Sequence, residues 1–257
     1  MSKPALAAAA AAAAAVCAWL WRRQRRQLYS RLAPVLCFGD SITEGYMGIW
    51  HHPTFAPARS DPTEWPSGEL EPLRLHPYAI HLGAALSAEA GEAGGGYKTA
   101  LCHAVARAYS GWTAAEMLAA LTRELAAGPW RAVVICAGSN DVVLGASAEA
   151  TLPLVRALHA ACDRHGVPVV VVPNPDCDMA HHGLCKDPAR QRAELTKLAA
   201  MLADGAAAAG RAVADARAAM PMDAAHAHLW DDSIHPSPAG SRALAQAVHA
   251  AMRKHGL

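Results

Sequence analysis

From residue 34 onward, short apolar runs alternate with longer segments of helical pattern, and this alternation constrains the fold most strongly. The runs are too short for helices and often stand beside Gly or Pro, which indicates buried strands. We expect these strands at residues 34–38, 99–106, 131–136, 167–172 and 211–215. The segments between and after them predict helices at residues 78–90, 113–127, 148–165, 187–209 and 238–254.

Strands that are apolar along their whole length and alternate with helices are typical of a parallel sheet covered on both faces. The sequence therefore predicts an α/β fold, namely a three-layer α/β/α, flavodoxin-like sandwich with a parallel sheet of about five strands. We expect two parts in the chain: an N-terminal segment at residues 1–30 and one globular domain at residues 34–257.

Four loops expected at one edge of this sheet carry unusual polar residues. In a parallel sheet, the loop after each strand emerges at the same edge, where such folds bind their ligands. In chain order the four stretches are Gly39-Asp40-Ser41, Tyr109-Ser110-Gly111-Trp112, Gly138-Ser139-Asn140-Asp141 and Asp232-Ser233-Ile234-His235.

These stretches match, in order, the blocks of a known family: G-D-S, a single glycine, G-x-N-D and D-x-x-H. The chain therefore resembles the SGNH (GDSL) hydrolases, over residues 34–257. The resemblance implies strand order 2-1-3-4-5 and a serine hydrolase that cleaves carboxylic esters. It also implies that the oxyanion is bound by the backbone N–H groups of Ser41 and Gly111 and by the side-chain amide of Asn140.

The residue types suit this chemistry. A serine hydroxyl is a weak nucleophile at neutral pH and needs a base within hydrogen-bond reach. His235 is the candidate base, because imidazole titrates close to neutral pH. Asp232, three residues earlier in the same loop, can accept the other ring N–H and fix the tautomer. Asp231 is the alternative residue for this role. We therefore expect a triad of Ser41, His235 and Asp232, with neither a cofactor nor a metal.

Each of these residues also has a plain structural interpretation. Ser41 can cap a helix after a strand, and Gly111 can be an ordinary turn glycine. Asn140 can cap a loop, and Asp232 with His235 can form a loop salt bridge. Asp141 is predicted to be a structural hydrogen-bonding residue.

The substrate pocket is expected to lie between two loops, at residues 46–77 and 174–186. Loops this long inside a compact domain are usually functional or disordered. The candidate substrate-binding residues are Asp40, Trp50, Trp65 and Trp112. Neither the natural ester nor its acyl chain length can be read from the sequence.

A second constellation is Cys177-x3-His181-His182-x2-Cys185. Two thiols and two imidazoles can hold zinc tetrahedrally, although this spacing fits no familiar zinc motif. The alternatives are a Cys177–Cys185 disulfide and an exposed loop beside the active-site edge.

The formal net charge of +1 argues against nucleic acid as a partner. The partner we expect is a small-molecule ester; the oligomeric state is not predicted. Two alternative functions are considered. One is an acyltransferase or carbohydrate deacetylase with the same site, and the other is an inactive binding module.

Residues 5–21 are an uncharged, alanine-rich run of 17, followed by four arginines between Arg22 and Arg26. As a helix this run spans about 25 Å, near the lower limit for crossing a bilayer. Arginines behind the run favour a membrane anchor with the catalytic domain on the cytoplasmic side. A transit peptide for the mitochondrion or plastid is the alternative, because no acidic residue precedes Asp40. A surface helix without a role is the third reading.

Overall fold

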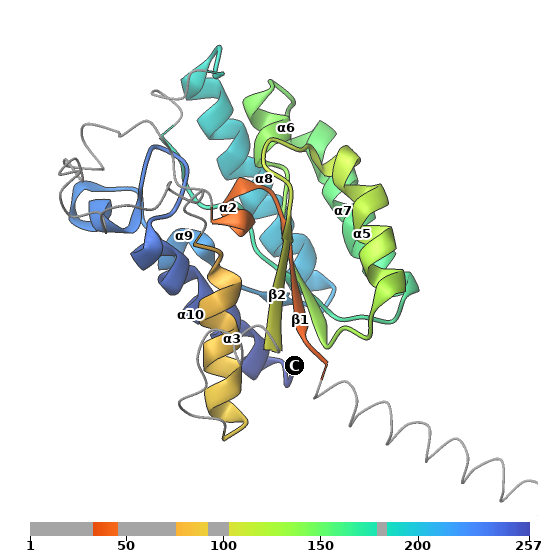
Figure 1. Cartoon of the computed structure of the whole chain (residues 1–257). Coiled ribbons are helices and arrows are strands. Elements are labelled where there is room, and N and C mark those ends of the chain that lie inside the picture. Colours follow the sequence, from red (N-terminus) through yellow and green to blue (C-terminus); the bar gives the residue numbers. More distant parts are fainter. Residues whose placement is uncertain (1–32, 46–75, 92–102, 179–183) are drawn as a thin grey trace, which may run out of the picture. The chain divides into compact units, whose positions relative to one another are not determined.

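Five parallel strands form the central sheet, in the order β2-β1-β3-β4-β5. Figure 1 shows β2 beside β1 in this sheet. They are β1 (Val35–Gly39), β2 (Ala104–Ala108), β3 (Ala132–Cys136), β4 (Val169–Val171) and β5 (Ala212–Val213). The computed structural model describes residues 33–45, 76–91, 103–178 and 184–257, and residues 34–257 form one compact unit. The predicted fold class and strand order are confirmed.

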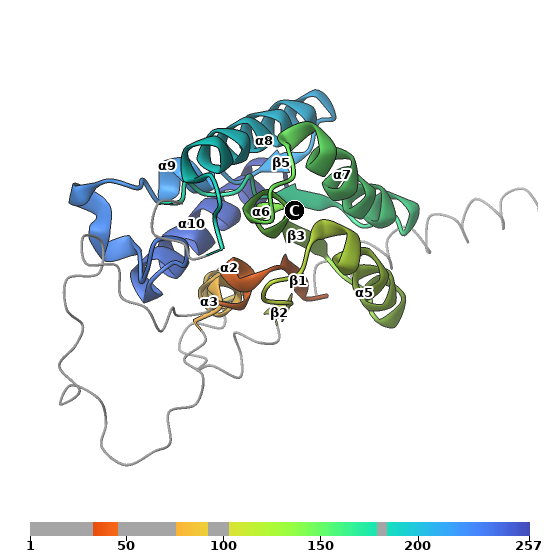
Figure 2. The same ribbon diagram turned by 90° about the horizontal axis from the view of Figure 1, so that it is seen from above.

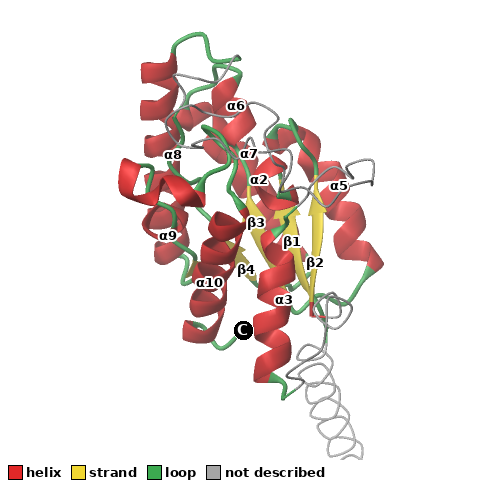
Figure 3. Ribbon diagram, turned by 60° about the vertical axis from the view of Figure 1, so that its left-hand side comes forward, coloured by secondary structure: helices red, strands yellow, loops and turns green. Residues whose placement is uncertain are grey.

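Helices cover both faces of the sheet (Figures 2 and 3). The long ones are α3 (Tyr78–Glu89), α5 (Ala114–Ala127), α7 (Ala148–Arg164), α8 (Pro188–Ala208) and α10 (Pro238–Lys254). The short ones are α2 (Ser41–Glu44), α6 (Ser139–Val143), α9 (Ala216–Ala219) and the 3-10 helix η3 (Ala224–Leu229). Helices α5, α7 and α8 pack on one face, and α3, α9 and α10 pack on the other.

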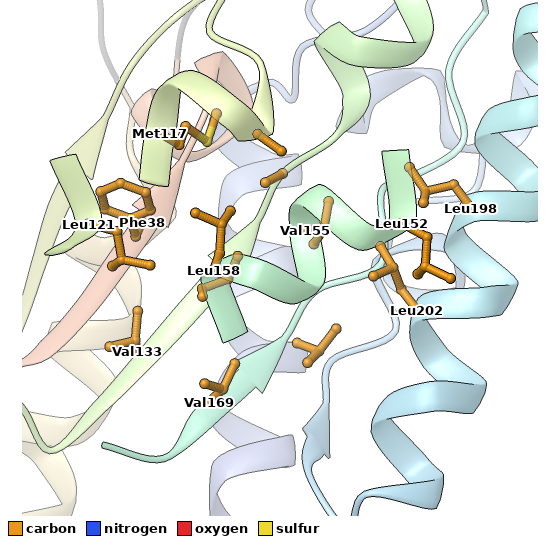
Figure 4. Close-up of a cluster of buried hydrophobic side chains, with 14 of the residues drawn as sticks. Phe38, Met117, Leu121, Val133, Leu152, Val155, Leu158, Val169, Leu198 and Leu202 are labelled. Atoms are coloured by element: carbon orange, nitrogen blue, oxygen red, sulfur yellow. The ribbon is translucent and has the colours of Figure 1, made fainter. Parts of the chain in front are cut away.

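Side chains of each strand alternate between these two helical layers. In β1, Leu36 and Phe38 belong to the core under α5, α7 and α8, part of which Figure 4 shows. Val35 and Cys37 belong to the core under α3 and α10. All four side chains are 0% exposed. Because both faces are covered, the strand is apolar throughout, which is the pattern seen in the sequence.

The predicted boundaries of two strands are wrong. The strand expected at 99–106 is observed at Ala104–Ala108, because its residues pair one for one with those of β1. Residues 99–102 lie outside the described residues. The strand expected at 211–215 is reduced to Ala212–Val213, at the sheet edge beside the three-residue β4. Asp215 instead caps α9, where it accepts a hydrogen bond from the backbone N–H of Ala218 at 3.0 Å.

The long helices follow the sequence pattern closely. Helix α10 has the predicted bounds, and the other four differ by at most one residue at either end. Their ends are marked by local chemistry: the hydroxyl of Ser237 caps α10 by accepting from the N–H of Gly240 at 3.2 Å. At α5, the carboxylate of Glu116 accepts from the backbone N–H of Thr113 at 2.8 Å, as half of a capping box.

The N-terminal segment at 1–30 and most of the loop at 46–77 lie outside the described residues, and so do Trp50 and Trp65. In the ranges that the structure describes, no helix is both long enough and apolar enough to cross a membrane.

Candidate active site

Ser41 is the first residue of α2, a one-turn helix that begins directly after β1. The carboxylate of Asp40 caps this helix, since its Oδ1 accepts a hydrogen bond from the backbone N–H of Ile42 at 3.1 Å. Gly39 permits the close turn, because a Cβ there would lie 2.3 Å from the backbone oxygen of Cys136. The chain thus leaves the sheet in a tight turn that presents Ser41 at the carboxyl edge of the strands.

The loop that carries His235 is folded around the carboxylate of Asp232. Oδ1 of Asp232 accepts hydrogen bonds from the backbone N–H groups of Ile234 at 2.7 Å and His235 at 2.6 Å. Its Oδ2 lies 2.7 Å from Nδ1 of the His235 ring. An antiparallel bridge between Trp230 and Pro236 closes the loop. These contacts hold the imidazole in one orientation.

Ser41 and His235 meet at this edge although 194 positions separate them in the chain: Nε2 of His235 lies 3.0 Å from Oγ of Ser41. An ionised carboxylate only accepts hydrogen bonds, so Nδ1 of His235 donates to Asp232. In the neutral ring, Nε2 then carries no proton and accepts a hydrogen bond from the hydroxyl of Ser41. The side chains of Asp232 and His235 are each 13% exposed, so little water competes for these bonds.

Asp232 is kept ionised by its partners. Burial by itself raises the pKa of this carboxyl, but the hydrogen bonds and charge of His235 and the two backbone N–H groups bring the pKa below its ordinary value. Asp231, the alternative orienting residue, is also buried, and its backbone N–H donates to the carbonyl of His235 at 2.9 Å. The carboxylate that contacts Nδ1 of the His235 ring, at 2.7 Å, belongs to Asp232.

The loop that carries Gly111 is attached to the helix that carries Ser41. The hydroxyl of Ser110 donates to the carboxylate of Glu44, the last residue of α2. Gly111 itself is exposed and has a φ of 78°, a left-handed conformation that favours glycine. The backbone N–H of Tyr109 donates to the carbonyl of Gly39 at 2.9 Å, which continues the pairing of β2 with β1.

Asn140 ties the same loop to α6, because its side-chain amide donates to the carbonyl of Trp112 at 2.9 Å. The ring of Trp112 stacks on that of Tyr109, with centroids 4.3 Å apart and planes 18° apart. Tyr109 in turn packs against Phe38 of β1, at a centroid distance of 5.8 Å. The structure thus brings the loops of Ser41, Gly111 and Asn140 together through direct contacts.

Asp40 requires a correction, because the structure does not place it where a substrate can reach it. Its side chain is 0% exposed, and its Oδ2 accepts a hydrogen bond from the hydroxyl of Ser139. Burial raises the pKa of Asp40, and the hydrogen bonds offset this only in part. Asp40 therefore joins α2 to α6 as a structural group. Asp141 has the structural role expected for it, since it accepts from the backbone N–H of Ala114 at 2.9 Å.

Sequence reasoning did not single out Glu44 and Ser110. A signal existed for Glu44, which lies three residues after Ser41 and hence on the same helical turn. No local pattern marked Ser110, whose partner is 66 positions away.

The structure bears on two interpretations of the stretch from Cys177 to Cys185, the disulfide and the zinc site. Cys177 is a free thiol in the buried interior, so it forms no disulfide with Cys185. Burial raises the pKa of the Cys177 thiol well above its ordinary value, which opposes the thiolate that zinc requires. His181 and His182 lie outside the described residues. Within the described part of the chain, no three His, Cys, Asp or Glu side chains are grouped to hold a metal ion.

With this geometry established, comparison places the chain in a class of enzymes. It matches the GDSL-like lipase/acylhydrolase family over residues 37–243 and belongs to that family. Membership supports a hydrolase. No curated protein sequence matches the chain significantly.

Solved structures with the same fold include several esterases. An aryl esterase from M. smegmatis has a TM-score of 0.62 at 18% identity, over 86% of this chain and 99% of its own. A carbohydrate acetylesterase family member from Sinorhizobium meliloti has a TM-score of 0.62 at 21% identity, over 88% of this chain and 100% of its own. A GDSL-like lipase from Bacteroides thetaiotaomicron has a TM-score of 0.60 at 16% identity, over 87% of this chain and 89% of its own. At these identities the likeness shows the fold.

Proposed function

We propose that this chain is a serine hydrolase that cleaves carboxylic esters through an acyl-enzyme on Ser41. The observation that carries the proposal is a continuous set of contacts: Ser41 Oγ lies 3.0 Å from His235 Nε2, and His235 Nδ1 lies 2.7 Å from Asp232 Oδ2. A nucleophile, a base and an orienting carboxylate in this order form the arrangement that activates a hydroxyl at neutral pH.

In the proposed reaction, Oγ of Ser41 attacks the ester carbonyl carbon while Nε2 of His235 takes the hydroxyl proton. The tetrahedral intermediate collapses as the alkoxy group leaves, and His235 returns the proton to it, so the alcohol departs. Water then attacks the acyl carbon while Nε2 of His235 takes one of its protons. The bond between the acyl carbon and Oγ of Ser41 breaks, His235 gives that proton to Oγ, and the carboxylic acid departs with the other hydrogen of the water. Asp232 stabilises the imidazolium at both stages and stays ionised, which its lowered pKa favours.

The oxyanion of each intermediate needs donors that are already in place. We assign these to the backbone N–H of Ser41, the backbone N–H of Gly111 and the amide of Asn140. Two observations support the assignment. Gly111 is exposed and has no side chain to block the approach of a substrate. Asn140 uses one amide N–H for the carbonyl of Trp112, and its amide carries a second.

Replacement of the nucleophile tests the proposal. Ser41→Ala should abolish hydrolysis of p-nitrophenyl acetate and butyrate, and it should abolish covalent labelling by a fluorophosphonate probe. Ser147→Ala, which alters only the cap of α7, should retain both. Circular dichroism of the two variants checks the fold. Activity of Ser41→Ala equal to that of the parent would falsify the assignment, and an unlabelled parent would favour the inactive binding module.

The acyl donor and acceptor are a separate question. The carbohydrate acetylesterase family member among the similar structures gives a reason to include acetylated sugars in the tests. A panel of acetylated sugars, alkyl esters of increasing length and added alcohol acceptors separates a deacetylase, an esterase and an acyltransferase. We expect simple acyl esters to give the highest kcat/KM, and a clear preference for acetylated sugars would select the deacetylase.

We also propose that residues 5–21 associate with a membrane and leave the catalytic domain on the cytoplasmic side. The apolar run followed by arginines supports this. Fractionation of a C-terminally tagged chain tests it: full-length protein in the soluble cytosol would exclude an anchor, and a shortened protein in an organelle would favour a transit peptide.

A further inference from the structure

The turn that carries Gly111 extends beyond the strand pairing that precedes it. Main-chain pairing of β2 with β1 ends at Tyr109, whose N–H donates to the carbonyl of Gly39 at 2.9 Å. Residues 109–112 then form a tight turn, closed by a hydrogen bond from the N–H of Trp112 to the carbonyl of Tyr109 at 3.1 Å. This bond fixes the local shape of the turn, but not the distance of its tip from α2.

The tip of the turn consists of Ser110 and Gly111 and is weakly packed. Both residues are exposed. Apart from the chain neighbours of Gly111, no atom of the described residues lies within 4 Å of a Cβ built on it. The place of the Gly111 N–H therefore depends on polar contacts between the turn and other elements.

Two such contacts flank Gly111. On its C-terminal side, the side-chain amide of Asn140 in α6 donates to the carbonyl of Trp112 at 2.9 Å. On its N-terminal side, the hydroxyl of Ser110 donates to the carboxylate of Glu44, at the end of α2. The first contact comes from a residue already assigned to the oxyanion. The second comes from a residue that has no part in the proposed reaction.

We propose that Glu44 is a positioning residue of the oxyanion site and acts through Ser110, an inference that rests on the function proposed above. Helix α2 begins at Ser41 and ends at Glu44. The contact with Ser110 therefore joins the helix that supplies one N–H to the turn that supplies the other, at Gly111. Both N–H groups must be in place before the oxyanion forms, and a displacement of about 1 Å can cost about 10²-fold in rate.

The role assigned to Glu44 is that of a hydrogen-bond acceptor rather than that of a charge. A negative charge near the oxyanion opposes the charge that develops in the transition state, so it gives no direct stabilisation. Glutamine has the same length and keeps an acceptor oxygen without the charge. Glu44→Gln should therefore keep kcat within about threefold of the parent, whereas Glu44→Ala should lower it by about 10–10².

Steady-state kinetics of the full-length protein on p-nitrophenyl butyrate test this. Glu44→Ala and Ser110→Ala should each lower kcat by about 10–10² and change KM by less than about twofold, because the lost interaction acts in the transition state. The double variant should be about as active as the poorer single variant, since both substitutions remove the same contact. Ser110 is exposed, so Ser110→Ala should leave the circular dichroism spectrum and Tm almost unchanged.

Glu124→Ala is the matched control. Its carboxylate lies 3.5 Å from Nε of Arg107 in β2, so it also joins two elements through a side-chain contact. Glu124 is near the end of α5 that lies away from the turn at residues 109–112. Because a partly exposed pair of this kind contributes little, kcat should stay within about twofold of the parent.

The outcomes separate this inference from the proposed function. A parent protein that hydrolyses no ester would overturn both. If the parent is active and Ser41→Ala is not, a Glu44→Ala variant as active as the parent would overturn the role of Glu44 alone. Losses that multiply in the double variant would also overturn that role, and so would equal losses in Glu44→Gln and Glu44→Ala.

Discussion

At the scale of single residues, two aspartates in neighbouring loops have opposite pKa shifts, and the difference supports the separate roles proposed for them. For Asp40, burial outweighs the hydrogen bonds and the pKa is raised. For Asp232, the bonds and charge of His235 and the backbone N–H groups outweigh burial and the pKa is lowered. A carboxylate that supports an imidazolium must remain ionised, and Asp232 meets this requirement.

Asp232→Asn tests the role of that carboxylate. The amide can leave His235 in the wrong tautomer, so kcat should fall by about 10²–10⁴ with a much smaller change in KM. Asp223→Asn is the matched control, because Asp223 forms an exposed pair with His226 at the same spacing, with Nδ1 2.8 Å from Oδ1. Steady-state kinetics on p-nitrophenyl butyrate measure both. Equal losses in the two variants would contradict the triad.

Asp40→Asn should make stability less dependent on pH. Because the pKa of Asp40 is raised on folding, its contribution to stability is present at low pH and is lost as pH rises through the folded value. The asparagine variant lacks this loss. The free energy of unfolding of the variant minus that of the parent should therefore increase between about pH 4 and pH 7. Urea unfolding at the two pH values measures it, and a difference that decreases with pH would be contrary to this account.

At the scale of elements, α7 shows how one helical face builds the core. Leu158 is 0% exposed and lies in the layer between the sheet and α5, α7 and α8 (Figure 4). Leu154, one turn earlier on the same helix, is 38% exposed. Helix α7 therefore carries one fully buried leucine and one partly exposed leucine, which can be compared by mutation.

Leu158→Ala should lower the free energy of unfolding by about 2–5 kcal/mol, because it removes buried apolar contacts and leaves a cavity. Leu154→Ala should cost less than about 1 kcal/mol, since that side chain is partly in water. Urea or thermal unfolding of the two variants provides the comparison. Similar losses in both would show that the described packing of α7 is wrong.

At the scale of the whole molecule, the site residues named above, from Ser41 to His235, belong to one compact unit at residues 34–257. Its described core lies on both sides of a single sheet. The N-terminal segment contributes no residue to the proposed chemistry.

Removal of residues 1–30 should therefore leave kcat/KM for p-nitrophenyl acetate within about twofold of the full-length value, as expected for a change remote from the reacting groups. Membrane association, if it depends on residues 5–21, should be lost in the same variant. Parallel assays of activity and of sedimentation with vesicles measure the two effects. A truncated chain that folds and yet has lost activity would show that the segment takes part in the site.

The parts of this protein that were predictable from sequence are those with local physical causes. Apolar runs without polar alternation indicated a sheet buried on both faces, and α10 has the bounds predicted for it, with Pro238 in its first turn. The chain order of the polar loops indicated one edge for Ser41 and His235. Strand ends were less predictable, because β2 and β5 are delimited by what their neighbours can pair with.

Sequence alone determined the class of fold and the residue types available at one edge of the sheet, because periodicity and turn chemistry act over a few neighbouring residues. Only the tertiary structure decided that Asp40 is buried and that Ser110 reaches Glu44. These features depend on contacts between segments distant in the chain. Their energies come from burial and charge, which exist only once the segments are packed together.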